Sequence, residues 1–237
     1  MREEHDMYAP LVSFFREKGM YVVREVTTHQ GRVDVLAVKL DLEAVKWRIA
    51  NGIGRAVTSP ALLRAWQALP ARSRPCRIEK WAATLGVQPA SLRAHARVLE
   101  ERGLLVVTTR GFARRTPWPR LVLEVACCEA KLHDWQRGLR QAFGHRFYAH
   151  RSYLALARVP RVVDKGLLTA RRVGLISVSR EGVSEKKKAP RIKPWDALTM
   201  RQIEEHVWSD LARTPARLQA ALAVTVGPTA AASRPTA

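Results

Sequence analysis

The stretch that most constrains this chain is an apolar run that ends in two opposite charges. Residues 121–128 read Leu-Val-Leu-Glu-Val-Ala-Cys-Cys, and Glu129-Ala-Lys131 follows directly. Alternate side chains of a strand share one face, so Glu129 and Lys131 are expected to point the same way. Charges at the exit of a buried strand pack poorly, and they suit a cleft in which they contact a third group. The ordinary alternative is a strand end that meets water, and the triplet alone does not decide between the two.

Composition restricts the class of protein and the class of partner. The 237 residues can bury a sizeable core, and a hydrophobic content of 47% excludes global disorder. Lys and Arg number 41 against 21 acids, a net charge of +20 that predicts nucleic acid as the partner. We find no long uncharged apolar run, no secretory signal pattern and no disulfide or zinc spacing among the three cysteines. We therefore expect no membrane partner and a cytoplasmic, nucleoid-associated protein.

The N-terminal segment predicts a helix and two strands with acidic residues at informative positions. Residues 4–18 have helical spacing and end before Gly19, and strands are predicted at residues 21–26 and 32–38. Glu4 lies over the apolar stripe of the helix, although an acid at a helix start is also favoured by the dipole alone. Asp34 interrupts a strand that is otherwise apolar. A buried aspartate is costly unless it is paired, hydrogen-bonded or bound to a metal, so Asp34 requires a partner.

A strongly basic segment separates the two predicted acidic strands. Residues 55–120 contain thirteen Lys and Arg against three Glu, which is half the net charge of the chain. Helices are predicted at 58–69, 77–85 and 88–102, followed by a β-ribbon with a basic tip near Arg110. This order resembles a winged helix-turn-helix domain over residues 58–115. In such domains the third helix enters the major groove and the wing contacts phosphate.

The winged-helix resemblance implies a set of DNA-binding side chains. For the third helix and the wing these are Gln88, Ser91, Arg93, His95, Arg97, Arg110, Arg114 and Arg115. Two alternatives stay open at this point. The helix is solvated and Arg97 pairs with Glu101, or the winged helix serves dimerisation.

With the basic segment set aside, the order of elements resembles the PD-(D/E)xK nuclease superfamily, which includes many restriction enzymes and Holliday junction resolvases. The matching text is Glu4-His-Asp-Met-Tyr-Ala-Pro-Leu, then Arg-Val-Asp34-Val-Leu-Ala-Val, then Glu129-Ala-Lys131, then a helix from Asp134 that carries Gln141. A strand at 151–157, a helix at 164–172 and a strand at 173–178 follow. The resemblance implies an α/β, restriction-endonuclease-like fold, with a mixed central sheet flanked by helices and an inserted, mainly α winged-helix domain.

The resemblance also implies a reaction and the residues that perform it. Asp34 and Glu129 would repel each other in a low-dielectric cleft, and oxygen ligands suit Mg²⁺ or Mn²⁺. In the family pattern, Glu4 and the carbonyl of Ala130 would belong to the metal site. Lys131 would hold the attacking water or stabilise the phosphate, and Gln141 would orient the substrate or the water. We therefore predict a metal-dependent endonuclease acting on double-stranded or branched DNA. Cutting both strands generally requires two active sites, which a homodimer would supply.

Two features depart from the family pattern. Asp34 and Glu129 are 95 residues apart rather than joined by a short hairpin, which an insertion explains. A tyrosine often follows the glutamine by four residues in the family, but here that position is His145 and Tyr148 comes seven residues after Gln141. A lone histidine in a basic protein is expected to meet phosphate or solvent, so no histidine is predicted as a metal ligand.

The predicted domain organisation has five parts. Residues 1–46 and 118–183 form the nuclease core, 47–117 the inserted domain, 184–225 a basic linker with helices at 197–212 and 216–224, and 226–237 a disordered tail. The helix at 197–212 either docks on the core or pairs with a partner. Two rival functions stay open: a catalytically inactive nuclease-fold protein that binds DNA as a regulator, and an RNA-directed or protein-interaction role.

Overall fold

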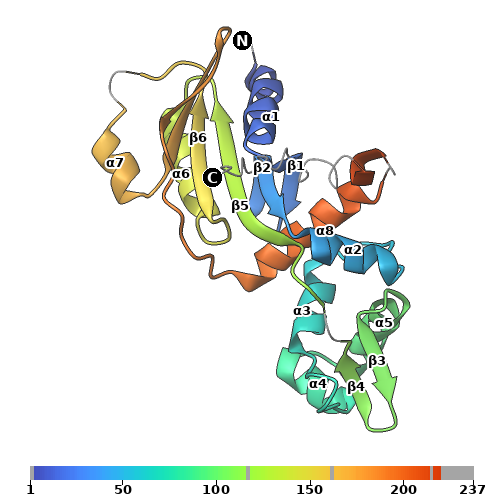
Figure 1. The fold of residues 1–237 in the computed structure, drawn as a ribbon. Coiled ribbons are helices and arrows are strands. Elements are labelled where there is room, and N and C mark those ends of the chain that lie inside the picture. Colours follow the sequence, from blue (N-terminus) through green and yellow to red (C-terminus); the bar gives the residue numbers. More distant parts are fainter. Residues whose placement is uncertain (1–2, 116–117, 161–162, 214–215, 220–237) are drawn as a thin grey trace, which may run out of the picture.

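A six-stranded mixed sheet forms the centre of the chain (Figure 1). The computed structural model describes residues 3–115, 118–160, 163–213 and 216–219. The sheet has the order β1-β2-β5-β6-β7-β8. Its strands are β1 (Tyr21–Thr28), β2 (Gly31–Leu40), β5 (Val122–Lys131), β6 (Arg151–Leu156), β7 (Gly174–Ser179) and β8 (Gly182–Lys187). The described residues also form a two-stranded sheet and nine helices, so the expected α/β class is confirmed.

The pairing of β2 with β5 brings together two segments that are far apart in sequence. The strands β1, β2 and β5 are antiparallel neighbours, β6 and β7 run parallel to β5 in turn, and β8 returns antiparallel to β7. Val35 is paired with Cys128, so the preceding Asp34 lies level with Glu129. The basic segment therefore connects two adjacent strands of one sheet.

Helices cover both faces of this sheet, and the alternation of side chains decides which core each residue joins. On one face a 3₁₀ turn, η1 (Glu4–Met7), leads into α1 (Tyr8–Glu17), which packs over Val35 and Ala37. The opposite face carries α6 (Trp135–His145), α7 (Lys165–Ala170) and α8 (Ala197–Leu211). Leu36 and Val38 pack there in one core cluster with α8. Asp34, Glu129 and Lys131 share this second face by period-two alternation.

The basic segment folds as a helical unit at one end of the sheet (Figure 1). It contains α3 (Pro60–Ala68), α4 (Ile78–Leu85), α5 (Pro89–Glu101), β3 (Leu105–Thr108) and β4 (Gly111–Arg114), which share a core of their own. Ser59 caps α3 and Gly86 ends α4 in the left-handed conformation, as these residue types favour. The three predicted helices and the ribbon are therefore present at the expected positions.

Two predicted boundaries fall inside regular elements. Helix α2 (Leu42–Ala50) was not predicted, and it spans the predicted boundary between the core and the inserted domain after residue 46. The expected linker at 184–195 is wrong for its first residues, because β8 pairs with β7 through Lys187. Val183 packs on the core and Glu185 accepts a hydrogen bond from the Tyr153 hydroxyl at 2.8 Å. The strand was not predicted because its lysines resemble a solvated charge run, although its side chains are exposed and half-buried in alternation.

The C-terminal helix α8 packs on the core and also contacts the segment that leads into the basic unit. Its apolar stripe, with Ile203 and Val207, joins the core cluster of β1, β2 and β5. Glu205 accepts hydrogen bonds from the Arg48 guanidinium at 2.8 Å and the Val57 amide at 2.9 Å. Of the predicted second helix at 216–224, the structure describes residues 216–219, as helix, and the predicted tail lies outside the described residues. No helix among the described residues is long and apolar enough to cross a membrane.

Candidate active site

Four side chains from three separate elements meet around the ammonium group of Lys131. The Nζ atom lies 2.9 Å from Glu129 Oε1 and 3.2 Å from Glu4 Oε2. It lies 3.9 Å from Asp34 Oδ2 and donates a hydrogen bond to the Ala130 carbonyl at 2.9 Å. Burial favours the neutral amine, but the three carboxylates outweigh it and raise the pKa of Lys131. Lys131 is therefore a cation held among three acidic groups.

The two strand carboxylates are almost completely buried. Asp34 is 6% exposed and Glu129 is 1% exposed. The Ala130 amide donates to Asp34 Oδ2 at 3.0 Å, which fixes this carboxylate against β5. Burial and the negative charge of Asp34 raise the pKa of Glu129 to about 7, although Lys131 opposes the shift. Glu129 Oε2 is buried without a hydrogen-bond partner. The two carboxylates therefore carry more negative charge than the single ammonium of Lys131 neutralises, and a further cation or a proton would stabilise them.

Helix α6 approaches this cluster closely because it has no side chain at residue 138. A Cβ atom added at Gly138 would lie 2.6 Å from Leu154 Cδ1 and 2.7 Å from Lys131 Cγ. Such separations are shorter than van der Waals contact, so a larger residue must displace one of these side chains. Gly138 thus determines where the stem of Lys131 lies.

Replacing Gly138 with alanine is expected to destabilise the fold by about 1–3 kcal/mol, because overpacking outweighs the better helix propensity of alanine. Gly144 in the same helix is the matched control, since nothing lies within 4 Å of an added Cβ there. Gly144→Ala is expected to stabilise by roughly 0.5–1 kcal/mol. Urea unfolding followed by circular dichroism measures both, and equal effects of the two substitutions would contradict the close packing of Lys131.

Gln141 and His145 extend the site along α6. They follow Gly138 by three and seven residues, which places all three on one face of the helix. His145 is buried, with Nε2 3.9 Å from Glu129 Oε2, and burial lowers the pKa of His145 to about 4. Gln141 Oε1 is buried without a hydrogen-bond partner in the described part of the chain. The expectation that His145 meets phosphate or solvent is therefore wrong; it is a neutral group beside Glu129.

Two further residues beside Asp34 were not singled out from the sequence. Tyr8 is buried on α1, and burial together with the Asp34 carboxylate raises the pKa of its hydroxyl. Arg32 Nη2 lies 4.0 Å from Asp34 Oδ1. The available sequence signals were weak: Tyr8 follows Glu4 by four residues, and Arg32 precedes Asp34 by two. Tyr148, whose role the family pattern left in doubt, is buried in the core with β5 and α8.

The chemistry of this donor set fits a hard divalent cation. Among the described residues, no group of three or more His, Cys, Asp or Glu side chains is placed to hold a metal ion. The strand carboxylates nevertheless supply oxygen donors from paired positions, and Glu129 Oε2 has no hydrogen-bond partner among the described residues. The Ala130 carbonyl is a further oxygen donor, which accepts a hydrogen bond from Lys131 Nζ at 2.9 Å. Two buried carboxylates that repel each other are relieved by a cation. The metal site would therefore consist of two carboxylates and one backbone oxygen, and the more exposed Glu4 carboxylate lies beside it.

The predicted DNA-binding residues lie mostly on the surface of the basic unit. Gln88, Ser91, Arg93, Arg97, Arg110 and Arg115 are exposed, and His95 is half-buried. Among the described residues, none of these arginines forms an ion pair, so the Arg97–Glu101 pair of the solvated alternative is not observed. Arg114 differs from the prediction: it is half-buried, with its guanidinium 5.7 Å from the ring centre of Trp66. The Arg114 amide donates a hydrogen bond to the carbonyl of Pro70, just after α3, at 2.9 Å, which holds Arg114 beside Trp66.

No protein-family model, curated protein or solved structure matches this chain. We therefore infer the function from the residues and from their arrangement.

Proposed function

We propose that this chain is a metal-dependent DNA endonuclease with a restriction-endonuclease-like core and an inserted winged-helix domain that binds DNA. The observation that carries the proposal is the meeting of Asp34, Glu129 and Lys131 at one point of the sheet. Asp34 and Glu129 are separated by 95 residues, yet Lys131 Nζ lies 3.9 Å from Asp34 Oδ2 and 2.9 Å from Glu129 Oε1. A structural ion pair needs only one acid, whereas a buried excess of acid is typical of sites that bind a cation and a phosphate.

Each group has a definite role in phosphodiester hydrolysis. Asp34, Glu129 and the Ala130 carbonyl would hold Mg²⁺ or Mn²⁺. The chemistry that such an ion supplies is a lower pKa of water and neutralisation of the charge that develops on phosphate. Lys131 would hold the attacking water or stabilise the negative charge of the transition state. Glu4 completes the outer acidic shell and keeps Lys131 protonated.

Two groups on α6 orient the reacting partners. Gln141 has an acceptor that no described group satisfies, and its amide suits a water or a phosphate oxygen. His145 is neutral and buried against Glu129, where a tyrosine often stands in the family that the sequence resembles. A neutral imidazole there limits the freedom of the Glu129 carboxylate without competing as a cation.

The test of this function is a cleavage assay with purified protein. Supercoiled, nicked and branched DNA are incubated with Mg²⁺ or Mn²⁺ and compared with the same reactions in EDTA. We expect metal-dependent cleavage of at least one duplex or branched substrate. Absence of cleavage on every DNA structure, or cleavage that persists when Lys131 is replaced, contradicts the proposal.

A second candidate is a catalytically inactive nuclease-fold protein that binds DNA as a regulator. The observation that favours it is that Lys131 already contacts all three carboxylates, while no three-donor group of side chains is present among the described residues. Calorimetric titration with Mn²⁺ separates the two functions. An inactive protein need not bind the ion, and Asp34→Asn would not change the titration.

The basic unit is expected to carry most of the affinity for duplex DNA. Arg93→Ala and Arg97→Ala remove exposed charges from α5, and each is expected to reduce the slope of log affinity against log salt by about 1. Fluorescence anisotropy of a labelled duplex at several salt concentrations measures this slope. Arg180→Ala, in the exposed β7–β8 turn of the core, is the charge-matched control. An equal reduction for the control would assign the affinity to net charge rather than to this surface.

A further inference from the structure

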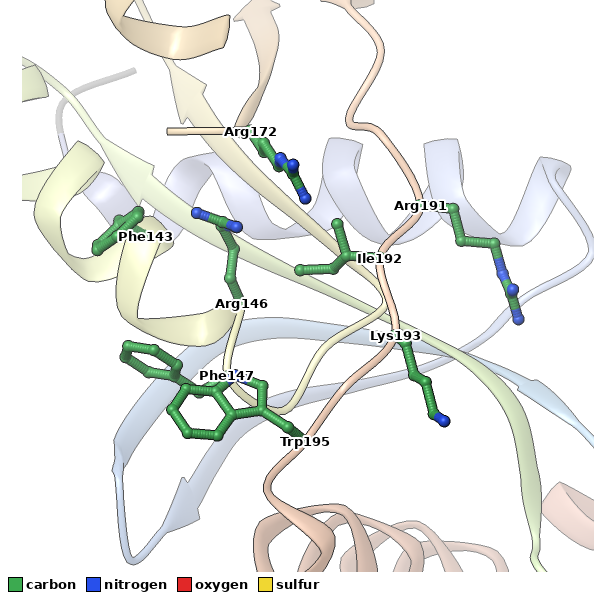
Figure 2. Close-up of a pocket in the computed structure, with 8 residues that line it drawn as sticks. All are labelled: Phe143, Arg146, Phe147, Arg172, Arg191, Ile192, Lys193 and Trp195. Atoms are coloured by element: carbon green, nitrogen blue, oxygen red, sulfur yellow. The ribbon is translucent and has the colours of Figure 1, made fainter. Parts of the chain in front are cut away.

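A second concave site lies at the C-terminal end of α6 (Figure 2). It is a cavity of about 540 Å³ between the turn that follows α6 and the extended segment that precedes α8. Three aromatic and four cationic side chains line it, together with one isoleucine and no acid. Phe143 projects from a different face of α6 from Gln141 and His145 by helical spacing, and Phe147 lies in the turn after the helix. This cavity is therefore separate from the candidate active site.

Two arginines in the cavity have no anionic partner. Figure 2 shows the guanidinium groups of Arg146 and Arg172 approaching the same space from the end of α6 and from the start of β7. Among the described residues, neither forms an ion pair, and the buried Nε of Arg146 has no hydrogen-bond partner. Burial and the charge of Arg172 lower the pKa of Arg146. Arg146 is half-buried, with its guanidinium 5.1 Å from the ring centre of Phe143, and Arg172 is exposed. An anion between the two groups would offset their repulsion.

The backbone at Arg172 supports a use for this side chain. Arg172 has a φ of +52° and is the second residue after α7. Glycine is the common residue at such a left-handed position, because other residues adopt it at a cost in free energy. Residues in strained backbone conformations cluster at functional sites, where the surrounding structure holds them in place.

An exposed aromatic pair stands beside the arginines. The rings of Phe147 and Trp195 are 4.9 Å apart at 77°, and they are 38% and 73% exposed. The amides of Trp195 and Asp196 both donate to the Phe147 carbonyl, at 3.1 Å and 3.0 Å, so the backbone holds the pair in place. A large apolar surface that is both exposed and positioned in advance suits stacking on a planar ligand.

We propose that this cavity binds an unpaired nucleotide of single-stranded nucleic acid. Arg146 and Arg172 take the phosphate, and the base stacks on Trp195. Bases within a duplex already stack on their neighbours, so an exposed indole selects an unpaired one. Its biological context rests on the proposed nuclease function: the substrates would be DNA with a displaced or branched strand. Such a strand would be held on one side of α6 while the carboxylate cluster acts on the other.

Binding is tested without cleavage, so that its result is independent of nuclease activity. The full chain is titrated into fluorescein-labelled oligothymidylate in EDTA, and anisotropy reports the affinity. Trp195→Ala is expected to weaken binding about tenfold, as loss of one base–aromatic stack does. Unlabelled polyglutamate is added as a competitor. If it displaces the oligonucleotide at the same monomer concentration as unlabelled oligothymidylate, the cavity is a general anion site or takes an acidic peptide, and the proposal is wrong.

Arg172→Gly separates binding from folding. Glycine relieves the left-handed backbone, so the midpoint of urea unfolding is expected to stay the same or rise. Affinity for the oligonucleotide is nevertheless expected to fall by roughly fivefold or more through loss of a phosphate contact. Arg180→Gly removes an identical side chain from the β7–β8 turn and is expected to change affinity less than about twofold. Equal losses for the two variants, or no loss for Arg172→Gly, overturn the proposal. Cleavage that fails while these differences persist rejects only the nuclease.

Discussion

Replacing Lys131 with methionine is expected to reduce DNA cleavage by about 10²–10³-fold, because removing one preorganised donor of transition-state charge typically has this effect. Methionine keeps the Cβ and Cγ atoms that lie nearest Gly138, has sulfur in place of Cδ, and removes the ammonium group. Asp34→Asn is expected to have an effect of at least the same size. Its amide oxygen can still accept from the Ala130 amide, whereas the charge needed to hold a cation is lost. The measurement is the rate of plasmid cleavage at saturating metal.

Controls separate a chemical effect from a structural one. Lys39→Met removes an exposed lysine from the same strand as Asp34 and is expected to leave the rate unchanged. Circular dichroism and duplex affinity should remain close to those of the unmodified protein for all three variants. Asp34→Asn also removes a charge that disfavours ionisation of Glu129, so its fold is expected to be at least as stable as the parent. Cleavage at the parental rate in either active-site variant would remove the basis of the nuclease proposal.

Replacing Arg48 with methionine is expected to destabilise the protein by about 3–5 kcal/mol, because it leaves a buried carboxylate without its partner. Arg48 is fully buried on α2, with Nη2 2.8 Å from Glu205 Oε1. Its guanidinium lies 5.0 Å from the ring centre of Trp118 and 5.3 Å from that of Trp208. The pair therefore joins α2 and α8 at the point where the basic unit enters the core. The midpoint and slope of urea unfolding measure the loss.

The double variant Arg48→Met/Glu205→Gln tests whether the loss arises from the unpaired charge. Removing both charges is expected to recover part of the stability, because no ionised group then remains buried alone. Glutamine keeps an oxygen for the Val57 amide that Glu205 accepts at 2.9 Å. Lys46→Met on the exposed side of α2 is the control and is expected to change stability by less than about 0.5 kcal/mol. A double variant as unstable as Arg48→Met would show that packing, rather than charge, dominates at this position.

Much of the local structure followed from periodicity and end signals. The apolar runs of β2 and β5 predicted strands because both faces of a central strand are buried. The helices of the basic unit followed from Ser59, Gly86 and Pro89, whose backbone preferences act within one turn of the chain. The requirement that Asp34 have a partner also followed from local reasoning, since a charge inside a buried strand is costly wherever its partner lies.

Other features depended on contacts between distant segments. The β8 strand escaped prediction because its period-two pattern is carried by half-buried lysine and glutamate stems, which resemble a solvated charge run in the sequence. The role of His145 was missed for a related reason. Its burial is set by the packing of α6 on β5 and β6, and no neighbour in sequence reports that packing.

The sequence by itself determined the residue types of the candidate site: two acids and a lysine on strands, and a further acid at a helix start. Only the tertiary structure decided that these groups meet, because the register of β2 against β5 sets Asp34 level with Glu129 across 95 residues. It also decided that Arg114 is packed against Trp66 and that Arg146 and Arg172 face each other. The physical reason is the distance along the chain over which each interaction acts. Propensity and periodicity act over a few residues, whereas charge pairing and burial depend on whatever the fold brings close.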